Sequence, residues 1–124
     1  MKKRIMPDFI NDNHLFHNPV EFALSKIGGT YKMPILWRLK ERTWRYNELR
    51  KSLPHASDRM LSKSLNELLT DGFISKAVFA EVPPRTEYRL TIRGRESIIV
   101  IDTLRSYGLK LMSEFDSESN APLR

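Results

Sequence analysis

A regular pattern of apolar and polar positions runs through the middle of the chain, between Pro54 and Gly72. Leucines recur there at helical spacing and form one stripe that must be buried: Leu61, Leu65, Leu68 and Leu69. The opposite face is polar and carries Arg59, Lys63, Asn66 and Thr70, with Ser62 on its flank. Ser57 suits the N-cap of such a helix, and Gly72 suits the left-handed residue that ends it. The pattern predicts an amphipathic helix over this stretch.

The polar face of this helix has two interpretations. Arginine and asparagine are the side chains that bind guanine and adenine edges in the major groove of DNA. The same residue types are also common on any solvated helix face. The neighbouring segments decide between the two.

Segments on both sides favour DNA binding. Upstream, Tyr46, Leu49 and Leu53 follow helical spacing before the break at 54–56, which gives the two short helices of a helix-turn-helix. Downstream, β-rich runs at 73–82 and 86–90 flank Pro83-Pro84-Arg85, and a short third strand is expected at 42–45. Prolines exclude a regular ladder at 83–84, so we expect an exposed tip carrying a cation, as in a wing. The predicted fold is α+β, mainly α: a winged helix-turn-helix with a small antiparallel sheet.

Two helices are expected before this unit. Pro19 to Ile27 is largely apolar and begins with a proline, which the first helical turn accepts. Gly28-Gly29 is a turn rather than a phosphate-binding loop, because the Walker spacing is absent. Thr30 is expected to cap a second helix over 31–40, with Pro34 near its first turn.

The last helix, expected from a cap at Thr91 to about Phe115, carries two apolar stripes. One contains Ile98, Ile101, Leu104, Leu111 and Phe115, and the other contains Ile99, Val100 and Tyr107. A surface helix needs only one such stripe. We therefore expect a second copy of the chain to cover the other, with Ile99, Val100 and Tyr107 in a homodimer interface.

The ends of the chain lack such patterns. We expect residues 1–17 to be a flexible arm, 18–115 to be the DNA-binding and dimerisation domain, and 116–124 to be a disordered tail. His14 and His17, near Asp8 and Asp12, have the residue types of a metal site, but the surrounding Asn and Asp residues argue against a rigid one. No metal or cofactor is expected.

Charge supports a polyanionic partner. The net charge is +6 and the pI about 9.8, and the segment from Lys40 to Lys63 holds seven cations against three acidic residues, a net +4. No apolar run is long enough to span a membrane, no signal core follows the basic start, and there are no cysteines. These features favour a cytoplasmic protein.

Several runs together have the pattern of one family: Asn18-Pro19-Val20-Glu21, Ile27-Gly28-Gly29-Thr30-Tyr31-Lys32, Tyr46-Asn47-Glu48-Leu49-Arg50, Ser57-Asp58-Arg59-Met60-Leu61-Ser62 and Val82-Pro83-Pro84-Arg85-Thr86-Glu87-Tyr88. From about Asn18 to Tyr107 the chain resembles the HxlR-type winged helix-turn-helix regulators, relatives of MarR-like repressors. The resemblance implies a DNA-binding homodimer with an interface of terminal helices and the Ser57 helix in the major groove. Two residues depart from the pattern. Asn18 stands where several members have a redox-sensing cysteine, and Pro34 is unexpected.

Three classes of function compete. A sequence-specific DNA-binding regulator fits best, and we assign double-stranded DNA binding to Arg45, Asn47, Ser57, Arg59, Ser62, Lys63, Asn66 and Arg85. A non-specific architectural binder would share the charge but would not need base-binding residues on one face. An enzyme is not expected, because no catalytic constellation stands out. A small-molecule effector near Tyr31, Trp37 and Trp44 is an open alternative to a plain core role for these residues.

Overall fold

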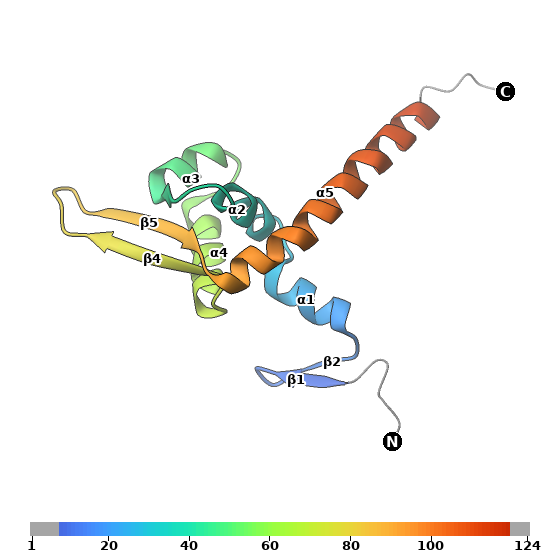
Figure 1. Ribbon diagram of the computed structural model, residues 1–124, viewed down its shortest axis with the longest axis horizontal. Coiled ribbons are helices and arrows are strands. Elements are labelled where there is room, and N and C mark those ends of the chain that lie inside the picture. The colour runs from blue at the N-terminus through green and yellow to red at the C-terminus, as the bar shows by residue number, and fades with distance from the viewer. Residues whose placement is uncertain (1–7, 120–124) are drawn as a thin grey trace.

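The structure is a computed structural model that describes residues 8–119, and its ribbon is shown in Figure 1. In chain order the elements are β1 (Phe9–Asn11), β2 (His14–Phe16), α1 (Pro19–Ile27), α2 (Lys32–Leu39), β3 (Trp44–Arg45), α3 (Tyr46–Ser52), α4 (Asp58–Thr70), β4 (Ile74–Phe79), β5 (Arg85–Leu90) and α5 (Ile92–Ser119). This order confirms the predicted winged helix-turn-helix with a small antiparallel sheet and a long C-terminal helix.

The core lies where α2, α3 and α4 meet the sheet. Its most deeply buried side chains include four leucines that helical spacing predicted to be buried, Leu49, Leu61, Leu65 and Leu68, together with Ile35 and Leu36 of α2. Ile74, Tyr88 and Leu90 close the core from the sheet, and Ile101 closes it from α5. Burying the leucine stripe of α4 leaves the opposite face of that helix in solvent.

The sheet has the strand order β3-β5-β4 and is antiparallel throughout. Trp44 pairs with Tyr88 and Arg45 with Glu87, which confirms the predicted third strand. β4 and β5 form a hairpin that extends away from the helices (Figure 1), and we call residues 74–90 the wing.

Local signals fix the ends of α4 and the start of α5. The Ser57 hydroxyl accepts a hydrogen bond from the Met60 N–H at 3.1 Å. Gly72 has a φ of +78°, and the Phe73 N–H donates to the Leu68 carbonyl, so a left-handed turn ends the helix. Thr91 Oγ1 accepts from the Gly94 N–H and donates to the Gly72 carbonyl, which confirms the predicted cap on α5 and ties α5 to the end of α4.

The structure departs from the expected flexible arm between Phe9 and Phe16. These residues form the hairpin β1–β2 around a two-residue turn, Asp12-Asn13, in which both φ angles are positive. The hairpin packs on α1, because the Phe22 ring lies 4.8 Å from the Phe9 ring and 5.1 Å from the Phe16 ring. Residues 1–7 of the expected arm lie outside the described residues.

Two further expectations differ. The residue at the N-cap of α2 is Tyr31, without a side-chain hydrogen bond, so the predicted cap at Thr30 is wrong. The start of the expected tail, 116–119, continues α5, and residues 120–124 lie outside the described part. The backbone hydrogen bonds of a helix form within the helix itself, so polar residues can continue α5 without packing on the core.

In Figure 1, α5 extends away from the other helices on the side opposite the wing, while α1 and the β1–β2 hairpin form a third projection. Ile101 is the last buried residue of α5 among those described. Beyond it, the Arg105 guanidinium still lies over the Trp37 ring of α2 at 5.4 Å, and most other side chains of α5 are exposed.

Candidate nucleic-acid interface

The helix-turn-helix is held together at the start of α4. Arg50 on α3 forms an ion pair and hydrogen bond with Asp58 in the first turn of α4, and the Tyr46 hydroxyl donates to the same carboxylate at 3.2 Å. The hydrogen bond from Arg50 lowers the pKa of the Asp58 carboxyl, and that carboxylate in turn raises the pKa of Arg50. This contact fixes how α4 projects from the domain and neutralises the acidic residue nearest its N-terminus.

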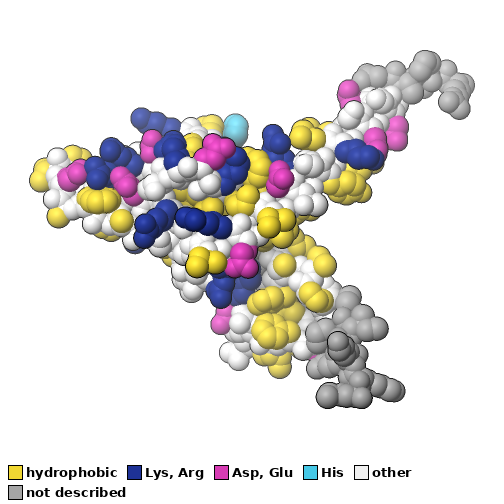
Figure 2. Space-filling view, viewed as in Figure 1, with side chains coloured by type: hydrophobic (Ala, Val, Ile, Leu, Met, Phe, Trp, Pro, Cys, Tyr) yellow, Lys and Arg dark blue, Asp and Glu magenta, His cyan; other side chains and the backbone are white. Residues whose placement is uncertain are grey.

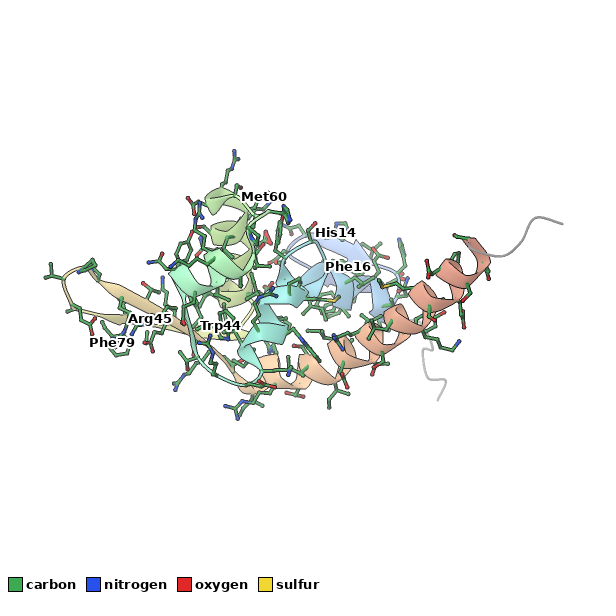
Figure 3. The ribbon with its side chains drawn as sticks, turned by 90° about the horizontal axis from the view of Figure 1, so that it is seen from above. His14, Phe16, Trp44, Arg45, Met60 and Phe79 are labelled. Carbon is green, nitrogen blue, oxygen red and sulfur yellow. The ribbon has the colours of Figure 1, made fainter. Side chains whose placement is uncertain are left out.

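The outward face of α4 presents the predicted base-binding side chains to solvent. Arg59, Lys63 and Asn66 are exposed, and none of them forms an ion pair or a side-chain hydrogen bond with another residue between 8 and 119. Ser62 is half-buried, and its hydroxyl lies 3.5 Å from the Tyr46 hydroxyl. In Figure 3 α4 projects from the body of the molecule, and Met60 is labelled in its first turn.

A shallow depression of about 710 Å³ runs along this face. Its walls come from α1, α2, α4 and the β1–β2 turn, and its lining includes Asp12, Lys26, Lys32, Arg59, Lys63, Asn66 and Glu67. Arg59, Lys63 and the Asn66 amide therefore share one concave surface, which suits contact with an anionic, hydrogen-bonding partner, while the other two lysines of the depression are paired with carboxylates.

Arg85 does not occupy the exposed position that was expected at the wing tip. It is the first residue of β5, its Nη1 lies 2.9 Å from Glu81 Oε1, and its Nε lies 2.9 Å from Glu87 Oε2, although that N–H is not aligned for a hydrogen bond. The guanidinium also stacks over the Phe79 ring at 4.2 Å. The expected exposed cation at the tip is wrong, because two carboxylates and a ring hold the side chain along the strands.

Arg45 and Asn47 lie at the junction of β3 and α3, beside the wing. Both are exposed, and with residues 81–86 they line a second depression of about 350 Å³. The Arg45 N–H donates to the Glu48 carboxylate at 2.8 Å, and this hydrogen bond lowers the pKa of Glu48. Figure 3 shows Arg45 and Trp44 along the wing strands, with Phe79 nearby. The structure thus places the side chains of Arg45 and Asn47 on the wing side of α4.

Lys26, Lys32 and Glu67 also lie at this face, and the sequence pattern did not predict them there. Lys32 is buried, and its Nζ lies 2.9 Å from Glu67 Oε2 on α4. Lys26 Nζ hydrogen bonds to Asn11 Oδ1 at 2.8 Å and lies 3.5 Å from Asp71 Oδ1 at the end of α4. These pairs join residues far apart in sequence, and apolar periodicity carries no signal for them.

The outer surface of α5 carries apolar side chains that its own domain leaves uncovered. Ile99 is 73% exposed, Val100 48% and Tyr107 56%, and Leu104, Leu109, Met112 and Phe115 are also exposed. In Figure 2 hydrophobic side chains lie along this helix and over α1 and the β1–β2 hairpin, while Lys and Arg gather over the half of the molecule that carries the wing.

Metal ligation has no support within residues 8–119, where no group of three His, Cys, Asp or Glu side chains is placed to hold an ion. His14 lies 3.9 Å from Glu21, and His17 lies 3.5 Å from Asp8. The described helices include none long and apolar enough to cross a membrane. Trp37 and Trp44 pack against the core, beside the cations of Lys40 and Arg42.

A helix-turn-helix with a wing, a solvent-facing second helix and unpaired basic residues on that helix defines the class of winged helix-turn-helix proteins. Residues 26–116 match the family model for the HxlR-like helix-turn-helix, and the chain belongs to this family. Similar proteins from Bacillus subtilis, YdzF and YdeP among them, are described as helix-turn-helix-type transcriptional regulators.

Three relatives illustrate the match. The chain is 42% identical over 92 residues to YdzF of Bacillus subtilis, an uncharacterised helix-turn-helix-type transcriptional regulator, covering 73% of this chain and 84% of that one. The structure of the redox regulator HypR in its reduced form matches with a TM-score of 0.76 at 34% identity, covering 81% of this chain and 99% of HypR. A MarR-family transcriptional regulator from Porphyromonas gingivalis matches with a TM-score of 0.70 at 34% identity, covering 73% and 89% of the two chains.

Proposed function

We propose that the protein is a sequence-specific, double-stranded DNA-binding transcriptional regulator that acts as a homodimer. The observation that carries this proposal is the outward face of α4, where Arg59, Lys63 and Asn66 are exposed and unpaired within the described residues. Ion pairs between exposed side chains contribute little to stability, so an exposed cation without a partner costs the fold little. Here the nearby carboxylates Asp58, Glu67 and Asp71 are each paired with a cation from another helix.

In this proposal α4 enters the major groove. Arg59 suits a bidentate contact with guanine, and Asn66 suits one with adenine. Lys63 and the hydroxyls of Ser57 and Ser62 suit phosphate contacts, which position the helix without specifying sequence. The wing lies on the adjacent groove or backbone, where Arg45, Asn47 and Arg85 provide the polar contacts. Arg85 must exchange at least one carboxylate partner for phosphate, so its contact with DNA is weaker than those of the unpaired residues on α4.

The homodimer follows from α5. Exposing this many apolar side chains of α5 to water is energetically unfavourable. In a two-fold symmetric dimer, the same surface of each subunit buries that of the other. Ile99, Val100 and Tyr107 are the residues we assign to that interface. Two α4 helices on one face of a duplex then require half-sites about 34–36 Å apart.

The structural relatives include a redox regulator, HypR, in its oxidised and reduced forms. This chain has no cysteine, so a thiol switch is not part of the proposal. In this proposal regulation acts through a non-covalent ligand or through protein concentration.

Selection from a pool of random duplexes tests the proposal. A specific dimer recovers a two-fold-related sequence, whereas an architectural binder recovers none. Affinity for the recovered site should also fall steeply with salt, as expected if a dimer neutralises roughly six to ten phosphates. A flat dependence of log affinity on log salt contradicts DNA binding altogether.

A further inference from the structure

The second half of α4 carries a basic and an acidic residue one turn apart, Lys63 and Glu67. Residues at this spacing are neighbours on a helix surface, so a Lys–Glu pair there normally attracts. In the structure Glu67 Oε2 is instead 2.9 Å from the Nζ of Lys32, which lies at the start of α2. Lys63 has no ion pair with another described residue.

Burial separates the roles of the two lysines. The Lys32 side chain is 11% exposed, while Lys63 lies in solvent. Burying an ammonium group without a partner is costly, and the Glu67 carboxylate offsets that cost for Lys32. Lys32 is therefore tied to Glu67, and its ammonium is not presented to a phosphate.

Lys32, Lys63 and Glu67 nevertheless share one surface. All three line the depression along α4, and all three line a smaller hollow of about 200 Å³ beside the Gly28-Gly29 turn. Glu67 therefore has two lysines within its neighbourhood and pairs with the one that belongs to another helix. The same arrangement recurs one turn later, where Lys26 of α1 pairs with Asp71.

We propose that Lys32 is a positioning residue for DNA binding: it holds Glu67, and this leaves Lys63 available to a phosphate. The inference rests on the proposed function, since it requires that α4 contact DNA. It makes no claim that Lys32 itself touches the nucleic acid.

The test is the salt dependence of binding to a random-sequence duplex of about three helical turns. In Lys32→Met, Glu67 loses its partner and competes for Lys63, so one phosphate contact is weakened in each protomer. For a dimer the magnitude of the log–log slope then falls, by at most about 1.8. Between 50 and 200 mM salt this reduces the loss of affinity by up to about 12-fold relative to the wild type. Methionine occupies a similar volume, so the fold should persist, and circular dichroism checks this.

A second substitution separates positioning from direct contact. Lys32→Met with Glu67→Gln removes the competing carboxylate, so the wild-type slope should return. If Lys32 itself bound phosphate, or served only to hold the fold, the double variant would keep the reduced slope. That result would overturn the proposal.

Lys40→Met is the matched control, because Lys40 pairs with Glu41 at the other end of α2. It removes the same charge, and its slope should equal that of the wild type. The proposal is also overturned if the slope falls equally in Lys40→Met, or if it does not fall in Lys32→Met. If Lys32→Met does not fold, Lys32→Gln replaces it with the same expectation. A wild-type protein without salt-dependent binding instead refutes the proposed function, and the two failures are distinguishable.

Discussion

Replacing Ile99 and Val100 together by aspartate should convert the protein from a dimer to a monomer. Complete burial of an isoleucine or valine side chain contributes about 1.5–3 kcal/mol. Because 73% of Ile99 and 48% of Val100 are still exposed, a partner can gain about 2–3 kcal/mol from these two residues in each protomer, or about 5 kcal/mol in a dimer. Losing that contribution raises the dimer Kd about 10³–10⁴-fold, and burying aspartate adds to the loss.

Sedimentation equilibrium over a range of protein concentrations measures this change. The wild type should sediment as a dimer and the double variant as a monomer that retains the helical circular dichroism of the wild type. Val78→Asp is the control for adding a charge at an exposed apolar position, because Val78 is 63% exposed on the wing. It should remain dimeric. A wild-type monomer that binds a single half-site tightly would refute the reasoning.

Three further predictions concern DNA and oxidants. Arg59→Ala and Asn66→Ala should each cost about 1–3 kcal/mol of binding and relax the preference at particular base pairs, measured against the selected site and a random duplex. An equal loss on both duplexes would exclude base contact. Arg85→Ala should weaken binding evenly on the two duplexes, and a selective loss on the selected site would contradict its assignment to phosphate or the minor groove. Diamide should leave band shifts of the wild type unchanged, because the chain has no cysteine. The Asn18→Cys variant, by contrast, places a thiol at the start of α1, where the helix dipole can lower the pKa of that thiol. A loss of wild-type binding that dithiothreitol restores would contradict this.

The helices were predictable because their packing follows from spacing along the chain. The leucine stripe of α4 and the apolar positions of α3 identify buried faces, and Pro19 and Ser57 identify helix starts through local hydrogen-bond chemistry. The same logic predicted the outward face of α4. It required no knowledge of which other elements cover the leucines.

The β1–β2 hairpin had a signal that was not used. Asp12-Asn13 is a two-residue turn of residues that tolerate positive φ, and apolar pairs flank it at Phe9-Ile10 and Leu15-Phe16. The two strands have only three residues each, so alternation alone does not identify them. The ring of Phe22 on α1 holds the hairpin in place, and that contact depends on the tertiary fold.

Ion pairs were the part of the site that sequence could not supply. The partner of Glu67 is 35 positions away at Lys32, and an equally plausible partner, Lys63, lies one turn away on the same helix. Only the packing of α2 on α4 decides between them. For the same reason the charge count between Lys40 and Lys63 predicted a basic region but not which cations are free.

The pairing of cations separates two parts of the proposed interface. On α4, the proposed contact of Arg59 with DNA would require no release of a carboxylate among residues 8–119, so the full electrostatic interaction of this side chain would be available for binding and for discrimination between bases. On the wing, Arg85 begins between Glu81 and Glu87, and any phosphate contact replaces an interaction that the free protein already has. Exchange of one anionic partner for another yields little net affinity, and the released carboxylates then repel the backbone. Sequence specificity in this protein should therefore reside mainly in α4, with the wing limiting where that helix can dock.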